Sequence, residues 1–330
     1  MFHRVSIVGL GLMGGAIGLA ARQARVANQI IGVADRPETV EQAKRMGCVD
    51  DALLNLKDGV QDADLVILAV PIRMIADVAR AVQPYLRHDS VLTDIGSSKA
   101  AIVASVEECF AQTKAKAHFV GSHPIAGSEK NGIESAPDVK FKDAFCIMTP
   151  TQVTDKDATP RLDEFWKALG MKTVRMSPAE HDTVLARSSH LPHVLSYLLS
   201  TMQTQRSFQY SGPGLKDMTR LSGSEVALWT DIFALNGKEL SKLMRDFGKE
   251  MLNLADEVEM MAYDPAHRGQ QSSPGAEAAR ERVFRFLADA KQRRDTRYTL
   301  AAEAAAAAAA AEAEEDGDAP GIREKDTQIL

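Results

Sequence analysis

One histidine of this chain stands between glycines, directly after a short apolar segment. His123 belongs to the run Gly-Ser-His-Pro-Ile-Ala-Gly-Ser-Glu-Lys at residues 121–130. An imidazole with an ordinary pKa of about 6.5 takes up a proton readily near neutral pH, so it suits general-base chemistry. A lone loop histidine more often caps a backbone group, but the flanking glycines and Glu129 favour a catalytic role. We therefore predict His123 as a base.

A serine follows another apolar segment. Ser97 comes shortly after residues 91–94, in the run Asp-Ile-Gly-Ser-Ser-Lys. Its hydroxyl could form hydrogen bonds with both His123 and a substrate oxygen, which would make it a second catalytic residue. Serine in such a turn is also a common N-cap of the helix that follows, and the two roles are compatible.

The start of the chain combines a strand, a glycine turn and a helix. Residues 5–8 run into Gly-Leu-Gly-Leu-Met-Gly at residues 9–14, and a helical pattern follows at residues 16–24. Such glycines allow a tight turn, close approach of a pyrophosphate and close packing of helix on strand. Free N–H groups at the helix start attract phosphates. The turn therefore predicts a dinucleotide cofactor.

A carboxylate ends the second predicted strand. Asp35 follows residues 30–34 and lies 21 residues after Gly14. It can accept hydrogen bonds from both hydroxyls of an adenosine ribose and would repel a 2′-phosphate, which predicts NAD. Arg36 leaves tolerance of NADP open, and Asp35 could instead only begin a turn before Pro37. The predicted cofactor-binding residues are Gly9, Gly11, Leu12, Met13, Gly14, Asp35, Arg36, Val70 and Pro71.

Short apolar segments alternate with helical patterns through the first half of the chain. Strands are expected at residues 5–8, 30–34, 65–70, 91–94, 118–121, 145–148 and 173–174. This alternation predicts an α/β fold with a Rossmann-type, doubly wound, mostly parallel sheet that has helices on both faces. Ligands of such sheets gather at the carboxyl ends of the strands. The glycine turn, Ser97 and His123 should meet there.

The pattern becomes all-helical after residue 177. Ser177 and Glu180 form a strong helix start around a proline, and Ser222 with Glu225 predicts another capping box. A continuous apolar stripe then follows at helical spacing: Leu240, Leu243, Met244, Phe247, Met251, Leu254, Val258 and Met261. It predicts a helical substrate and dimerisation domain, although packing within one chain would also explain the stripe.

Polar side chains of the helical half could line a site. His190 and His193 are three residues apart and share one side of a helix with Tyr197, while Pro192 between them bends or starts that helix. Zinc could use such a pair, but a third ligand is lacking, so we predict no metal. Arg220 could bind a carboxylate as a fork, although an arginine there by itself more often lies on the surface.

Composition limits the remaining possibilities. The chain has 330 residues, 45% hydrophobic and 25% charged, and a formal net charge of −6, so we expect neither nucleic-acid binding nor disorder of the whole chain. Three widely separated cysteines indicate a reduced cytoplasmic protein, and no export signal or membrane span is expected. We predict an NAD-binding domain at residues 1–177, a helical domain at 178–295 and a frayed or disordered Ala/Glu-rich tail at 296–330.

These motifs together resemble the prephenate and arogenate (cyclohexadienyl) dehydrogenase family of tyrosine biosynthesis. The resemblance rests on residues 9–15, 94–97, 121–129 and 190–193, and on Asp-Met-Thr-Arg at 217–220 followed by Trp229. It spans about residues 1 to 295, in order along the chain. The combination of the two histidine segments is its most specific part.

The resemblance implies an NAD-dependent oxidoreductase that decarboxylates prephenate, arogenate or both. The hydride would pass from ring C4 to NAD, with His123 as base and loss of CO2. The other site residues would be Ser97, which orients His123, Arg220 at a substrate carboxylate, His193 at the side-chain end of the pocket, Ser128 and Glu129 as a gate, and Trp229 from the partner subunit of a homodimer.

Two alternatives remain open at this point. A β-hydroxyacid-type dehydrogenase begins with a similar glycine turn and would need Lys216 or Lys238 as its catalytic lysine. That reading leaves the segment around His123 without a purpose. A non-catalytic NAD-binding sensor would bind the cofactor without turnover.

Overall fold

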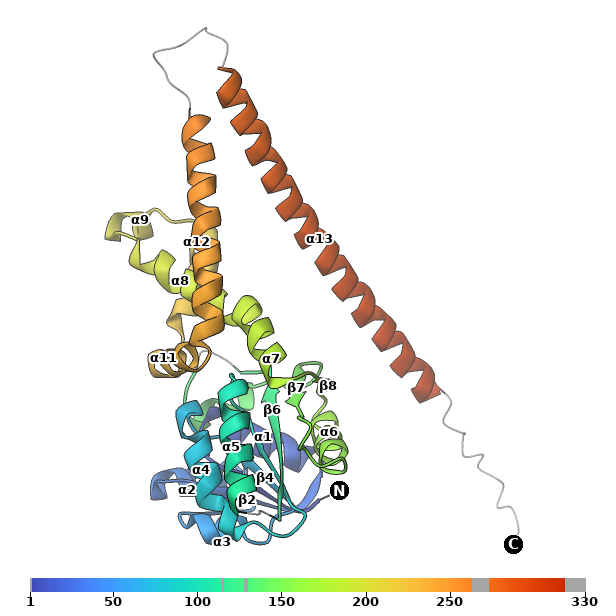
Figure 1. The fold of residues 1–330 in the computed structure, drawn as a ribbon. Coiled ribbons are helices and arrows are strands. Elements are labelled where there is room, and N and C mark those ends of the chain that lie inside the picture. The colour runs from blue at the N-terminus through green and yellow to red at the C-terminus, as the bar shows by residue number, and fades with distance from the viewer. Residues whose placement is uncertain (1, 114–115, 128–129, 263–272, 318–330) are drawn as a thin grey trace, which may run out of the picture. The chain divides into compact units, whose positions relative to one another are not determined.

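The structure is a computed structural model that describes residues 2–113, 116–127, 130–262 and 273–317, with no side-chain description beyond residue 300. Within these ranges eight strands form one sheet in the order β3-β2-β1-β4-β5-β6-β7-β8 (Figure 1). The strands are β1 Phe2–Val8, β2 Ala27–Val33, β3 Asp51–Leu53, β4 Leu65–Leu68, β5 Val91–Asp94, β6 His118–Pro124, β7 Phe145–Thr149 and β8 Lys172–Arg175. All neighbours pair in parallel except β6 and β7.

Helices connect the strands across both faces of the sheet, which confirms the predicted doubly wound α/β fold. They are α1 Leu12–Gln23, α2 Pro37–Arg45, α3 Leu56–Val60, α4 Ile75–Val82, α5 Ala100–Thr113 and α6 Ala158–Ala168. Short 3-10 turns are η1 Ile72–Met74, η2 Gln83–Tyr85 and η3 Ile133–Asp138. In Figure 1, α4 and α5 lie together over one face.

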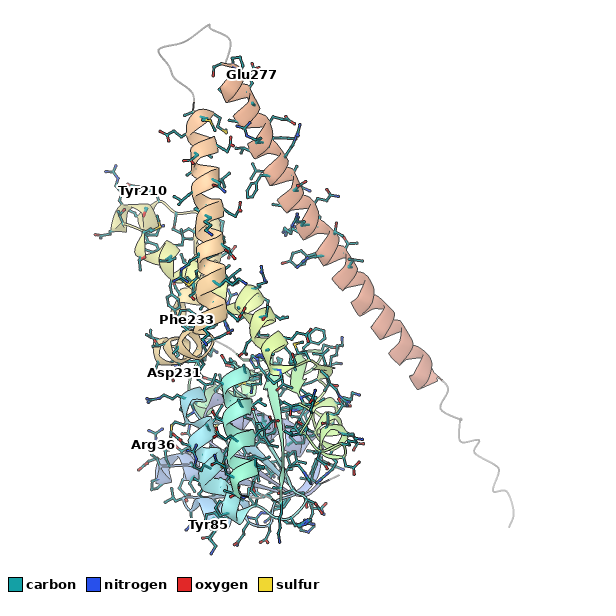
Figure 2. The ribbon with its side chains drawn as sticks, viewed as in Figure 1. Arg36, Tyr85, Tyr210, Asp231, Phe233 and Glu277 are labelled. Atoms are coloured by element: carbon teal, nitrogen blue, oxygen red, sulfur yellow. The ribbon has the colours of Figure 1, made fainter. Side chains whose placement is uncertain are left out.

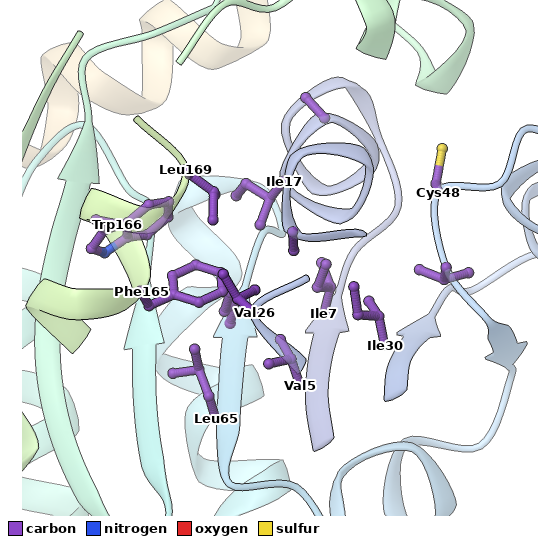
Figure 3. Packing of buried hydrophobic residues seen from close by; sticks show 14 of the residues in the cluster. Val5, Ile7, Ile17, Val26, Ile30, Cys48, Leu65, Phe165, Trp166 and Leu169 are labelled. Carbon is purple, nitrogen blue, oxygen red and sulfur yellow. The ribbon is translucent and has the colours of Figure 1, made fainter. Parts of the chain in front are cut away.

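Alternation along the central strands divides the buried side chains between two cores. Ile7 and Ile67 belong to one core, while the next residues along each strand, Val8 and Leu68, belong to the other. Successive side chains of a strand point to opposite faces, so an apolar run serves both. Figure 3 shows part of the first core, where Ile17 of α1 and Phe165 and Trp166 of α6 cover the sheet.

One strand was not predicted, and several strand boundaries differ from the expected ones. β3 was not predicted, because three residues are too few to show the alternation of a strand. β4 ends at Leu68 instead of residue 70, since the chain turns at Ala69 beside Gly9. β6 continues beyond residue 121 to Pro124, because this extension pairs in antiparallel fashion with β7.

The second half of the chain is helical, as predicted. Its elements are α7 Pro178–Leu185, the π-helical turn η4 Ala186–His190, α8 Leu191–Thr201, α9 Gln205–Gln209, α10 Pro213–Thr219, the 3-10 turn η5 Arg220–Gly223, α11 Val226–Leu235, α12 Gly237–Met260 and α13 Pro274–Gly317. Pro192 stands in the first turn of α8. It lacks the N–H of a regular helical bond, which agrees with the helix start expected there.

One of the two predicted helix caps is right and the other is wrong. Ser177 caps α7, and its side chain accepts a hydrogen bond from the N–H of Glu180. Ser222 does not cap α11, because it lies inside η5, where its hydroxyl donates to the carbonyl of Thr219. Glu225 is the cap instead, and its carboxylate accepts from the N–H groups of residues 227 and 228.

The chain divides into two compact units, Met1–Met244 and Arg245–Leu330. In the second unit, Arg282 of α13 forms a bidentate ion pair with Glu257 of α12. The alanine run at residues 304–311 lies within α13. Among the described residues, no helix combines the length and the apolarity that a membrane span requires.

Candidate active site

Two glycines make the turn between β1 and α1 possible. Gly9 has a φ of +97°, and a Cβ added to it would lie 2.4 Å from the carbonyl oxygen of Ala69. A Cβ on Gly14 would lie 1.9 Å from the carbonyl oxygen of Gly9. Any larger residue would push the turn away from β4 or open it. The turn therefore depends on glycine at both positions.

The third glycine, Gly11, leaves open space at the N-terminus of α1, and we call this turn and helix start the nucleotide cradle. Gly11 is the N-cap of α1 and makes no side-chain cap hydrogen bond. A Cβ added to Gly11 would meet no atom within 4 Å. The N–H groups of the first turn, including those of Leu12 and Met13, thus begin a helix whose positive end is open to an anion. These residues fit the pyrophosphate of a dinucleotide.

The flanks of the cradle carry the other predicted cofactor residues. The Asp35 side chain, just beyond β2, is 91% exposed, and its Oδ1 lies 3.8 Å from Nε of Arg36. Figure 2 shows Arg36 at the outer surface of this unit. On the other side, a Cβ on Gly9 would lie 3.0 Å from the backbone nitrogen of Val70, which precedes Pro71. An exposed carboxylate at this strand end can accept hydrogen bonds from the ribose hydroxyls.

His123 lies on the same edge of the sheet as the glycine turn. β1, β4, β5 and β6 are consecutive parallel neighbours, so their carboxyl ends form one row. His123 is the sixth residue of β6, pairs with Ile147 of β7, and is 8% exposed. The sequence placed it just after a strand, whereas the antiparallel pairing makes it part of the strand. Its backbone is therefore held by a sheet instead of a loop.

The loop after β6 approaches the glycine turn. Gly127 has a φ of +144°, and a Cβ added to it would lie 3.7 Å from Sδ of Met13. The segment that follows His123 thus returns to the start of α1. Ser128 and Glu129, the two residues predicted to gate the pocket, lie outside the described residues.

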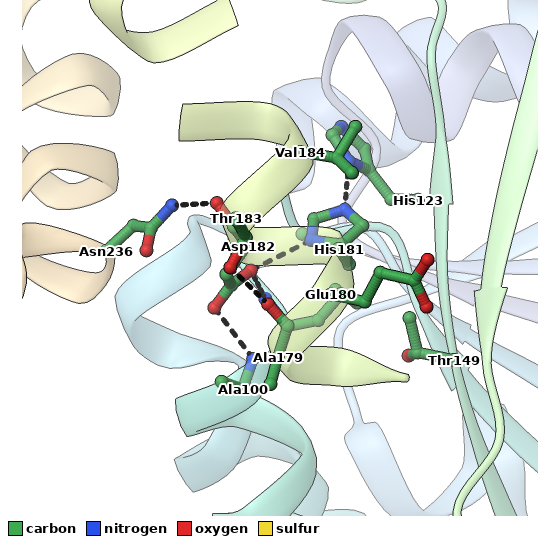
Figure 4. A network of polar contacts seen from close by, with 12 residues as sticks. Ala100, His123, Thr149, Ala179, Glu180, His181, Asp182, Thr183, Val184 and Asn236 are labelled. Atoms are coloured by element: carbon green, nitrogen blue, oxygen red, sulfur yellow. Dashed lines mark hydrogen bonds and ion pairs between the residues drawn. The ribbon is translucent and has the colours of Figure 1, made fainter. Parts of the chain in front are cut away.

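A histidine that the sequence analysis did not single out contacts His123, and an aspartate, also not singled out, contacts that histidine in turn. The Nδ1 atom of His123 lies 2.9 Å from Nε2 of His181, and Nδ1 of His181 lies 2.8 Å from Oδ1 of Asp182 (Figure 4). All three side chains are buried. The sequence offered one weak signal for His181, which is its place in the first turns of the helix that Ser177 was expected to cap.

Asp182 also binds the start of α5. Its carboxylate accepts hydrogen bonds from the backbone N–H groups of Lys99, at 2.7 Å, and Ala100, at 2.9 Å. A residue 83 positions away in the chain therefore does the capping that Ser97 could have done. Among the described contacts, the partner of the His123 ring is His181, and the Ser97 backbone lies near His190 and raises its pKa against the effect of burial.

A buried ion pair lies behind the histidines. Lys99 and Asp94 are both fully buried, and the Lys99 ammonium contacts the Asp94 carboxylate and donates to the carbonyl of Ser122 at 2.9 Å. Burial lowers the pKa of Lys99, and the charge of Asp94 opposes that change. The pair joins the ends of β5 and β6 beneath the candidate base.

The helical half contributes two more histidines and a tryptophan. His193 stacks on Trp229 of α11, and His190 meets the same indole edge-on at 6.0 Å between ring centroids. Asn236 donates to Nδ1 of His190 at 3.1 Å and to the backbone carbonyl of Asp182 at 2.7 Å. Trp229 was expected to come from a partner subunit. Here Trp229 of α11 stacks on His193 of the same chain, and the contribution from a partner subunit stays a prediction.

Burial keeps these imidazoles neutral. Desolvation, helped by the nearby His181 and Lys99, holds the pKa of His123 well below its ordinary value. Burial likewise lowers the pKa of His190 to about 4. Desolvation also lowers the pKa of His193, and the charge of exposed Arg220 adds to this effect. Arg220 thus lies close enough to His193 to act on it electrostatically, and His123 is unprotonated at neutral pH, as a base must be.

The fold and this edge of the sheet define an NAD-dependent dehydrogenase, with a nucleotide cradle and a buried imidazole on one row of strand ends. Comparisons with known proteins agree. A family model described as the nucleotide-binding domain of prephenate dehydrogenase matches residues 17–175. A second, described as the dimerization domain of prephenate dehydrogenase, matches residues 177–271. The chain belongs to the prephenate dehydrogenase family and is an oxidoreductase.

Similar proteins cover most of the chain. The prephenate dehydrogenase of Bacillus subtilis is 30% identical over 100% of this chain and 85% of its own length. The cyclohexadienyl dehydrogenase of Zymomonas mobilis is 32% identical over 77% of this chain and 88% of its own length. Prephenate dehydrogenase from Aquifex aeolicus, solved with hydroxyphenyl propionate and NAD+, is 29% identical with a TM-score of 0.75, over 89% of this chain and 98% of that one. Synechocystis arogenate dehydrogenase is 26% identical with a TM-score of 0.70, over 89% and 99%.

Proposed function

We propose that this chain oxidises and decarboxylates prephenate, arogenate or both, with His123 as the general base. The observation that carries the proposal is the place of His123, buried and neutral, on the row of strand ends that also holds the nucleotide cradle. The similar proteins of Bacillus subtilis and Zymomonas mobilis are named prephenate dehydrogenase and cyclohexadienyl dehydrogenase, which supports this substrate class.

The reaction follows from the chemistry of a ring alcohol. NAD+, when bound, supplies the acceptor for the hydride that leaves C4 of the ring. His123 takes the proton of the 4-hydroxyl while that carbon–oxygen bond becomes a carbonyl. The bond to the ring carboxylate then breaks, CO2 leaves, and the released electron pair makes the ring aromatic. His123 returns the proton to the ring oxygen, which ends as a phenol.

The remaining site residues bind and orient the substrate. Arg220 is suited to a substrate carboxylate because its guanidinium presents a planar pair of donors. His193 and Trp229 form a stacked wall at the side-chain end of the pocket. By family resemblance, Ser97 orients the hydroxyl of the substrate, and Ser128 with Glu129 closes the pocket. Prephenate and arogenate differ by a keto or an amino group at that end.

The test is turnover by the full-length purified protein. Incubation with NAD and each substrate should produce NADH absorbance together with CO2, and kcat/KM for the two substrates gives the preference. Cofactor binding without NADH formation from either substrate would contradict the proposal and favour a sensor.

We further propose that the chain forms a homodimer through its helical domain. Several apolar side chains of α12 are well exposed, including Met251 at 52% and Val258 at 49%. Sedimentation of wild type should give a dimer, and Met251→Lys should shift it toward monomer, since a buried ammonium is costly. Val153→Lys, at a loop residue that is 75% exposed, is the matched control and should sediment as wild type.

A further inference from the structure

We propose that Asp182 and His181 are positioning residues that fix the proton of the His123 ring on Nδ1 and so leave Nε2 of His123 as the proton-accepting atom. The inference rests on the proposed role of His123 as base. It concerns which nitrogen acts and what holds it there, and the contacts that carry it are drawn in Figure 4.

The chain of hydrogen bonds begins at a group that can only accept. Burial raises the pKa of Asp182, but the hydrogen bonds from His181, Lys99 and Ala100 outweigh that effect and hold the pKa below its ordinary value. Asp182 is therefore an ionised carboxylate with no proton to donate. Its Oδ1 already accepts the N–H of Lys99 at 2.7 Å. The contact with Nδ1 of His181 at 2.8 Å must then be a donation by His181.

The second link follows from the first. Burial lowers the pKa of His181, so its ring is neutral at neutral pH and carries one proton. That proton lies on Nδ1, which leaves Nε2 of His181 as an acceptor. The contact of 2.9 Å between this nitrogen and Nδ1 of His123 requires a donor, and His123 must supply it. A neutral His123 then has its lone pair on Nε2.

The same hydrogen bonds connect the His181–Asp182 pair to α5 on one side and to Asn236 on the other. The Asp182 carboxylate binds the start of α5, and its backbone carbonyl accepts from Asn236 at 2.7 Å. Asn236 also donates to Nδ1 of His190 at 3.1 Å. His181 is fully buried, so water cannot replace its acceptor nitrogen. When His123 takes up a proton, the Asp182 carboxylate on the far side of His181 stabilises the new charge, as the aspartate of a catalytic triad does.

Two substitutions separate hydrogen bonding from shape. His181→Phe keeps a planar ring but removes the acceptor, so His123 can adopt either tautomer. We expect kcat to fall about a hundredfold or more, while Kd for NAD and KM for substrate change by no more than about threefold. His181→Gln offers an amide oxygen near the position of Nε2 and should recover kcat to within about tenfold of wild type. His88→Phe, at an exposed histidine, is the control and should retain wild-type kinetics.

Selective 15N labelling of histidine in the full-length protein measures the tautomer directly, without turnover. At about pH 8, where ordinary histidines are neutral, the His123 ring should show protonated Nδ1 and bare Nε2 in wild type. It should show a mixture of tautomers in His181→Phe. A wild-type ring protonated on Nε2 would overturn the inference, as would a kcat of His181→Phe within about threefold of wild type.

The measurements separate the two proposals. Absence of NADH formation by wild type would defeat the proposed function while leaving the tautomer measurement valid. Active wild type with a His123 ring protonated on Nε2 would defeat only the positioning role. If His181→Phe does not fold, the wild-type spectrum still decides the question.

Discussion

The imidazole of His193 lies flat against the indole of Trp229, with ring centroids 3.4 Å apart and ring planes 21° from parallel. Nδ1 of His193 donates to the carbonyl of Ser189 at 2.9 Å, because a carbonyl can only accept. Within the described part of the chain, no hydrogen bond to Nε2 of His193 is found, so this nitrogen can bind a ligand. Trp229 is 9% exposed and packs with Phe233, which is labelled in Figure 2, so residues of α11 hold the indole in place.

Replacing the candidate base should abolish turnover without loss of the cofactor. In His123→Asn, kcat should fall by about 10² to 10⁴, because a positioned general base contributes that much. Kd for NAD should stay within about threefold of wild type, since the nucleotide cradle lies at the other end of the row of strands. Steady-state kinetics and NAD titration measure both. Near-normal kcat would exclude His123 as the base.

The role of Arg220 predicts a change in substrate binding. Arg220→Gln removes a charge-assisted fork that would hold a substrate carboxylate both before and during reaction, so KM should rise by about tenfold or more while kcat changes less. Arg45→Gln, at an exposed arginine on α2, should change neither constant. An unaltered KM in Arg220→Gln would remove this arginine from the carboxylate site.

The open space at Gly11 makes an unusual prediction for a glycine. Gly11→Ala should change the free energy of unfolding by no more than about 1 kcal/mol, because its Cβ meets nothing within 4 Å. Kd for NAD should nevertheless rise by about tenfold or more, since the methyl group would occupy the approach of the pyrophosphate. Chemical denaturation and NAD titration test the two effects.

Gly212→Ala is the matched control for that experiment. Gly212 also stands at a helix N-cap, that of α10, and a Cβ there also meets nothing within 4 Å. It should leave both the stability and Kd for NAD close to wild type. Equal NAD affinity in Gly11→Ala and Gly212→Ala would mean that the pyrophosphate does not approach at Gly11.

Buried histidines should make stability depend on pH. An unfolded histidine binds a proton near pH 6.5, whereas burial holds the pKa of folded His190 at about 4. Between these pH values the unfolded state carries the additional proton, so the free energy of unfolding should fall as pH falls from 6.5 to 4. At about 1.4 kcal/mol per pH unit, His190 contributes roughly 3 kcal/mol of that loss.

Urea denaturation across this pH range provides the measurement. His190→Gln should show a shallower decline than wild type, while the exposed His88→Gln should decline as steeply as wild type. Parallel curves for His190→Gln and wild type would contradict the expected low pKa of His190.

Local patterns made much of the architecture readable from the sequence. The glycine turn, the apolar strands and the Ser177 cap were predicted because each depends on residues within a few positions of one another. The edge of the sheet that holds His123 followed from the alternation of strands and helices. Ser222 was mistaken for a cap because a serine followed three residues later by a glutamate is typical of a capping box. In the structure Ser222 lies in the 3-10 turn η5, before α11 begins.

By itself, the sequence determined the fold class, the nucleotide cradle and the identity of the candidate base, because backbone geometry at glycine and the two-residue period of strands are local properties. Only the tertiary structure decided what surrounds that base. The contact of His123 with His181, the capping of α5 by Asp182 from 83 positions away, and the bridge from Asn236 to His190 all join distant segments. Hydrogen bonds of this kind form only when folding has brought buried donors and acceptors together, where each must find a partner.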